Sequence, residues 1–178
     1  MGRFATITLL VSMLVTPGFP EIHPAVEGVK KSIESQTPPA RDRPMMSKKD
    51  FDQHLNFYEN PSSKASLIAD YFFCLDDTIK NRYFDLFVTM CDETVKKSPT
   101  QAFIDMCVFI ELNNSYITDS QLEKALSRVI TYGTRAMNSL PQGFVEWRQS
   151  YKEGLDTLRM MYKRLTKERK EIKRTETR

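Results

Sequence analysis

From residue 47 onward, apolar residues recur along the chain at alternating steps of three and four positions. That spacing places them on one face of an α-helix. The longest run lies near the C-terminus and comprises Phe144, Trp147, Tyr151, Leu155, Leu158, Tyr162 and Leu165. No segment shows the apolar–polar alternation of a half-buried strand. The pattern predicts an all-α fold, an irregular bundle of five to six helices in one domain over residues 47–178.

Residues that commonly cap helix N-termini precede the predicted helices. They are Ser47, Ser62 or Ser63, Asp76 or Asp77, Ser98, and Thr118 or Asp119. Asn60-Pro61 is expected to end one helix, and Pro99 to hold the first position of another. The segment 102–112 is apolar on nearly every side. It is therefore predicted to form the buried centre of the bundle.

The N-terminus has the layout of a secretory signal peptide. Arg3 precedes an uncharged, largely apolar run over residues 4–15, and Pro17 and Gly18 follow it. This run is too short to span a bilayer, which needs about 20 apolar residues, and no later stretch qualifies. We expect residues 1–18 to be a signal peptide and the mature protein to be secreted, without an integral membrane span.

The segment 19–46 contains many helix-breaking residues and few large apolar ones. Its prolines are Pro20, Pro24, Pro38, Pro39 and Pro44. Such a composition predicts a flexible, Pro-rich segment between the signal peptide and the helical domain.

The chain has three cysteines, so at most one internal disulfide can form. Cys91 lies eight residues before Pro99 and Cys107 lies eight after it. In a helical hairpin that turns at Pro99, equal distances from the turn bring two residues to the same height. We predict a Cys91–Cys107 disulfide, worth about 3 kcal/mol by loop closure. A Cys74–Cys91 bridge and three buried free thiols remain the alternatives.

Two stretches of the chain share a loose Cys–Tyr pattern. Cys74, Tyr83 and Cys91 form the first copy; Cys107 and Tyr116 form a second, in which Lys124 replaces the last cysteine. With the signal peptide, this arrangement over residues 74–116 resembles the bicycle proteins, secreted salivary effectors of gall-forming aphids and their relatives. The resemblance implies delivery into a host plant, where the target would be a host macromolecule, and no enzymatic activity.

Residue patterns typical of catalysis are absent from the sequence. The two histidines, His23 and His54, have no metal-ligand spacing with cysteines, and no glycine-rich phosphate loop or Gly-x-Ser-x-Gly elbow occurs. We therefore expect no enzyme and no cofactor. Asn113-Asn114-Ser115 is an N-glycosylation sequon in a predicted loop, which makes Asn113 a candidate glycan acceptor.

Positive charge is concentrated at the C-terminus, although the net charge of the chain is only +3. The cluster comprises Lys163, Arg164, Lys167, Arg169, Lys170, Lys173 and Arg174. Cations at the end of a helix are stabilised by the helix dipole, which explains the cluster without a function. The functional interpretations are an anionic surface, a nucleic acid, or a nuclear-localisation-like signal.

These observations lead to three hypotheses. The first is a secreted, non-enzymatic protein that binds an extracellular or host protein, as a salivary effector would, through an exposed apolar patch. The second is a carrier of a small hydrophobic ligand held in an apolar cavity between helices. The third is a basic, cytokine-like or membrane-active factor whose binding to anionic surfaces weakens in salt.

Mass spectrometry of the protein from its native source tests the secretion hypothesis. Signal-peptide removal should give a new N-terminus near Phe19, because Thr16, Pro17 and Gly18 follow the apolar run. A mature protein that still begins at Met1 would contradict secretion by this route.

Overall fold

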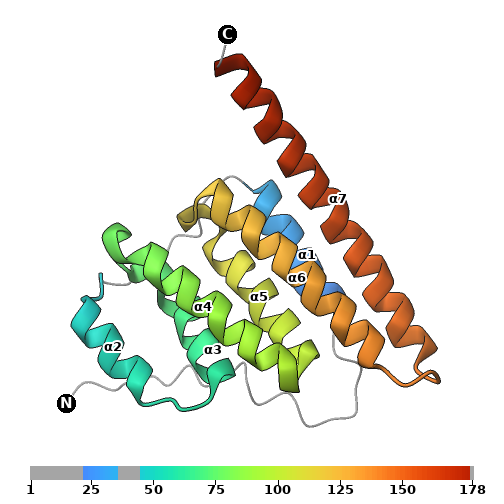
Figure 1. The fold of residues 1–178 in the computed structure, drawn as a ribbon, viewed down its shortest axis with the longest axis horizontal. Helices are drawn as coiled ribbons and strands as arrows, with labels where there is room; N and C mark the ends of the chain where they lie inside the picture. The colour runs from blue at the N-terminus through green and yellow to red at the C-terminus, as the bar shows by residue number, and fades with distance from the viewer. Residues whose placement is uncertain (1–21, 36–44, 177–178) are drawn as a thin grey trace.

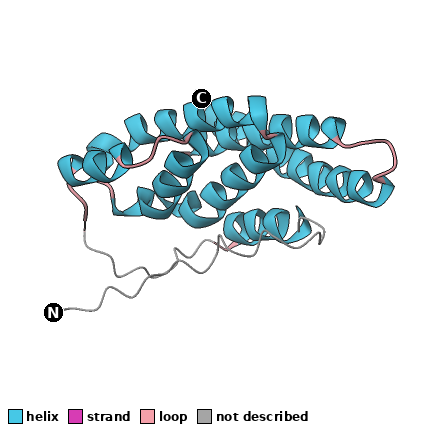
Figure 2. Ribbon diagram, turned by 90° about the horizontal axis from the view of Figure 1, so that it is seen from below, coloured by secondary structure: helices cyan, strands magenta, loops and turns pink. Residues whose placement is uncertain are grey.

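The computed structural model describes residues 22–35 and 45–176, and these residues form helices and loops with no strand (Figures 1 and 2). The predicted all-α class is confirmed. The described residues hold seven α-helices: six lie within residues 47–178, where five to six were expected, and the additional one is α1. The proposed signal peptide, residues 1–18, lies outside the described residues. The elements are α1 (Ile22–Glu34), α2 (Lys48–Asn56), α3 (Pro61–Tyr71), η1 (Phe72–Cys74), α4 (Asp77–Lys97), α5 (Pro99–Asn113), η2 (Asn114–Tyr116), α6 (Asp119–Ser139) and α7 (Val145–Glu176), where η denotes a 3-10 helix.

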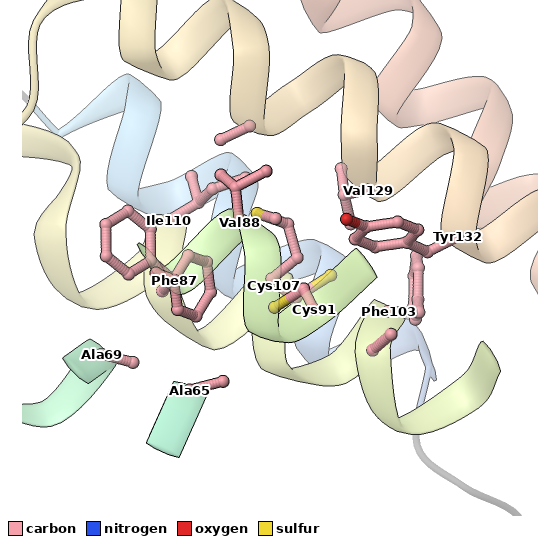
Figure 3. Packing of buried hydrophobic residues seen from close by; sticks show 14 of the residues in the cluster. Ala65, Ala69, Phe87, Val88, Cys91, Phe103, Cys107, Ile110, Val129 and Tyr132 are labelled. Atoms are coloured by element: carbon pink, nitrogen blue, oxygen red, sulfur yellow. The ribbon is translucent and has the colours of Figure 1, made fainter. Parts of the chain in front are cut away.

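Helix α5 occupies the centre of the bundle, as its apolar sequence predicts. Helices α1, α3, α4 and α6 all contact it. Its Phe109 is fully buried and packs against three other rings, with centroid distances of 5.1 Å to Phe72, 5.8 Å to Phe84 and 4.2 Å to Phe87. Side chains from α3, α4, α5 and α6 meet around this helix (Figure 3). Burial of these rings supplies much of the driving force for assembly.

Helix α1, Ile22–Glu34, lies within the segment 19–46 that was predicted to be flexible, and it corrects that prediction for these residues only. Ile22, Val26 and Val29 follow one another at steps of four and three, and all three are buried against the core. Pro24 is tolerated because it lies in the first turn, where the backbone N–H groups have no partner within the helix. At Gly154 of α7 a Cβ atom would lie 3.1 Å from Val26, so the glycine permits the close approach of α1 and α7.

Several predicted helix starts are confirmed. The Ser47 Oγ accepts a hydrogen bond from the Asp50 backbone N–H at 3.2 Å, and the Asp76 carboxylate accepts one from Thr78 at 2.8 Å. Thr118 forms a full capping box with Gln121. One assignment was wrong: neither Ser62 nor Ser63 caps α3. Asn60 caps this helix instead. Pro61, at the first helical position, has no N–H, so the Asn60 side chain accepts a hydrogen bond from the backbone N–H of Ser62.

Three tyrosine rings lie in the core while their hydroxyls reach acceptors near the surface. Tyr83 donates to Asp52 at 2.5 Å, Tyr132 to Asp92 at 2.8 Å, and Tyr151 to Thr100 at 3.1 Å. These bonds join α4 to α2, α6 to α4 and α7 to α5. Each tyrosine therefore satisfies its polar atom and fixes the position of a neighbouring helix.

The predicted Cys91–Cys107 disulfide is absent, and no disulfide joins any of the three cysteines. Phe109 turns towards α3 and α4, and Cys107 lies about 200° from it around the helix. Cys107 is therefore on the side of α5 where Glu111 contacts α1. Equal spacing from Pro99 predicts the height of each cysteine along its helix, but not the direction in which its side chain points.

The substitution Phe109→Ala tests the role of the central aromatic cluster. It should lower the free energy of unfolding by about 3–5 kcal/mol, because it removes three ring contacts and leaves a cavity. Urea denaturation followed by circular dichroism measures the change. Phe57→Ala is the matched control, since Phe57 is 83% exposed and its loss should change stability by less than about 0.5 kcal/mol. Equal effects of the two substitutions would contradict this account.

Candidate functional site

The predicted basic cluster lies on α7, whose C-terminal part extends past the rest of the bundle (Figure 1). Three of its cations have acidic partners. Arg164 pairs with Glu168 at 2.9 Å, Lys167 approaches Glu171 at 3.9 Å, and Arg169 pairs with Glu123 of α6. The side chains of Lys173 and Arg174 lie outside the described residues. The cluster is thus partly neutralised within the protein.

The remaining lysines of this cluster belong to a longer row of cations along α7. The row, here called the α7 cation row, consists of Lys152, Arg159, Lys163, Lys167 and Lys170. Steps of seven, four, four and three residues place them on one face of the helix. Within the described part of the chain, Lys152, Lys163 and Lys170 form no ion pair, whereas Arg159 pairs with Asp156 at 3.0 Å.

Sequence reasoning missed Lys152 and Arg159 because it treated the basic residues as a block at the chain end. Their signal was present in the seven-residue step between them, which keeps two side chains on nearly the same face of a helix. The row therefore begins well before the basic tail.

An exposed apolar turn precedes the cation row. In the α6–α7 turn, Phe144 is 45% exposed and Val145 is 68% exposed. The Phe144 ring stands edge-on to Trp147, with centroids 5.8 Å apart. A guanidinium nitrogen of Arg148 donates a hydrogen bond to the Leu140 carbonyl across the turn. Val145, the first residue of α7, lies seven residues before Lys152, so Val145 and the cation row share one face of α7, whereas Phe144 lies next to that face in the preceding turn.

Two surface hollows occur on the described part of the protein. One lies between α1 and α5, and the other between α6 and α7; most of the residues that line each of them are polar or charged. The first is lined by Gly28, Lys31, Ser32, Ser35, Glu111, Leu112, Asn114 and Ser115, and the second by Ser120, Glu123, Tyr162, Thr166, Arg169 and Lys170. Neither has the apolar lining expected of a carrier for a hydrophobic ligand.

Asn113 does not lie in a loop, as the sequon interpretation required. It is the last residue of α5 and has no exposed surface. Its side-chain nitrogen, the atom to which a glycan would be attached, donates hydrogen bonds to the Ala69 carbonyl at 2.8 Å and the Phe109 carbonyl at 3.1 Å. The first bond satisfies a carbonyl group in the last turn of α3 and joins it to the end of α5. In the folded protein the predicted glycosylation site is therefore inaccessible.

The reactive groups of the core are held in their neutral or fully hydrogen-bonded forms. Burial raises the pKa of the Cys91 and Cys107 thiols, so neither is an activated nucleophile. Asp105 is 5% exposed, and its two oxygens accept hydrogen bonds from Gln101 at 2.8 Å and Ser62 at 3.0 Å. No group of histidine, cysteine and acidic side chains among the described residues could hold a metal ion.

No protein-family model, curated protein or solved structure gives a significant match to this chain. No helix among the described residues is long and apolar enough to cross a membrane.

The buried carboxyl of Asp105 predicts a pH dependence of stability. Burial raises its pKa from 3.8 to about 6, although hydrogen bonds from Gln101 and Ser62 oppose the shift. The folded state therefore holds its proton more tightly than the unfolded state. The contribution of this group to stability should fall between about pH 4 and pH 6 and stay low at neutral pH.

Asp105→Asn should remove this component of the pH dependence and raise the free energy of unfolding at pH 7 by up to about 3 kcal/mol. An asparagine can still accept from Gln101 and donate to the Ser62 hydroxyl. Urea denaturation from pH 4 to pH 8 measures the effect. Unchanged pH dependence in the variant would show that Asp105 does not titrate in this range.

Proposed function

We propose that this chain is a non-enzymatic binding protein that recognises another macromolecule or a macromolecular surface through one face of α7. The observation that carries the proposal is the joint placement of exposed Val145 and the α7 cation row on that face, with half-exposed Phe144 in the turn beside it. Contiguous exposed apolar groups beside charged ones are typical of interaction sites.

A second exposed aromatic pair, Phe57 and Tyr58, lies between α2 and α3. Glu59 follows it directly, and no row of like charges adjoins it. The α7 face is preferred because it combines apolar area with an excess of positive charge, two properties that together give both affinity and orientation. The polar hollows and the filled aromatic core give no comparable support to a ligand carrier.

Secretion and an effector role of the bicycle type are the more specific part of this proposal. Secretion is supported by the composition of residues 1–18. The effector role is supported by the motif Cys74, Tyr83 and Cys91, in which both cysteines are buried and Tyr83 bonds to Asp52. These residues connect elements of the core, so a contact surface has to be sought elsewhere, on α7.

Site-specific photo-crosslinking tests the proposed binding face. A photoreactive amino acid at Val145 should give a discrete adduct in the native environment of the protein, and excess unlabelled protein should compete it away. Glu93 is the matched control position, because it is exposed on α4, a helix that packs mainly against α3 and α5. Equal labelling from both positions, or labelling from Glu93 only, would contradict recognition through α7.

A further inference from the structure

We infer that the α7 face docks on the surface of an anionic lipid bilayer, with the cation row against the headgroups and the α6–α7 turn inserted between them. This inference rests on the proposed function, since it names the partner of the same face. It also explains why exposed Val145 and the cation row share one face of α7.

Charge complementarity is the first argument. Lys152, Lys163 and Lys170 have no acidic partner within the described part of the chain, so their charges are available to an external anion. From Lys152 to Lys170 the row covers 18 residues of helix, or about 27 Å. That length is about three times the Debye screening length at physiological salt. Lysines at the two ends of the row therefore act independently, and each contacts its own headgroup.

The position of α7 gives these charges access to a flat surface. Helices α6 and α1 pack against one side of α7, which lies at the edge of the bundle (Figure 1). The other side is free along its length, because Lys152, Lys163 and Lys170 are all exposed. A single straight helix presents its charges in a line, and such a line can lie on a planar array of headgroups.

Exposed apolar side chains on the same face favour lipid over a water-soluble polyanion. Val145 is 68% exposed at the start of the helix, and Met160, seven residues before Lys167, is 65% exposed. A bilayer interface receives such side chains together with lysines, whose long apolar stems lie along the headgroup region. The backbone of a nucleic acid would leave Val145 and Met160 in water.

Flotation with phospholipid vesicles tests the inference on the full chain, so that any contribution of residues 1–21 is common to every variant. The protein should bind vesicles of phosphatidylcholine and phosphatidylserine more tightly than vesicles of phosphatidylcholine alone, and high salt should remove the difference. The triple substitution Lys152→Gln/Lys163→Gln/Lys170→Gln should weaken binding to the anionic vesicles about 100-fold.

The matched control is Lys49→Gln/Lys96→Gln/Lys97→Gln, which removes the same charge from exposed positions on α2 and α4. It should bind as the unsubstituted chain does. Phe144→Ser/Val145→Ser should weaken anionic-vesicle binding, whereas Phe57→Ser should not. Circular dichroism of each variant confirms that the helices are retained.

Three results would overturn the inference: equal loss in the triple variant and its control, no preference for anionic vesicles, or tighter binding to duplex DNA or heparin than to vesicles. In the last case the α7 face would serve a soluble polyanion. A discrete protein adduct from Val145 without vesicle binding would overturn the lipid inference and leave the proposed binding function standing.

Discussion

Complete enclosure of α5 is the constraint on which the rest of the fold depends. A 15-residue helix that is apolar on nearly every side has no face for water, so other helices must cover it. Helices α3, α4 and α6 cover part of its circumference, and α1 covers the side that bears Cys107 and Glu111. The recruitment of α1 from a proline-rich segment follows from this need, because a bundle of α2–α7 alone would expose that side of α5.

The elements of the fold that depend on local sequence were predictable. The apolar run 102–112 indicated a central helix, and Ser47, Asp76 and Thr118 marked helix starts because capping is a contact between near neighbours. Helix α1 was not predicted, because the proline content of residues 19–46 was given more weight than the spacing of their apolar residues. Five prolines suggested flexibility, whereas Ile22, Val26 and Val29 already showed the helical steps of a buried face.

The direction in which a side chain points and its burial in the folded protein could not be predicted from spacing along the sequence. Equal spacing from Pro99 left open the direction in which Cys107 points. The sequon at Asn113 describes an acceptor for a glycan and contains no information about burial; here the same amide joins the ends of α3 and α5. Three of the five residues of the α7 cation row were predicted, because Lys163, Lys167 and Lys170 belong to the basic tail. Lys152 and Arg159 join them only when the residues are placed around the helix.

The contrast between the inside and the outside of the bundle supports the α7 face as the proposed binding site. Inside, thiols are kept protonated by burial, tyrosine hydroxyls are bonded and Asp105 is satisfied by Gln101 and Ser62, so these groups are committed to stability. On the free face of α7, apolar side chains meet water and Lys152, Lys163 and Lys170 lack acidic partners within the described chain. A surface that satisfies both deficits must be anionic and able to receive apolar groups. Fewer partners meet both of these requirements than could bind a protein surface in general, and a bilayer of anionic lipid meets both.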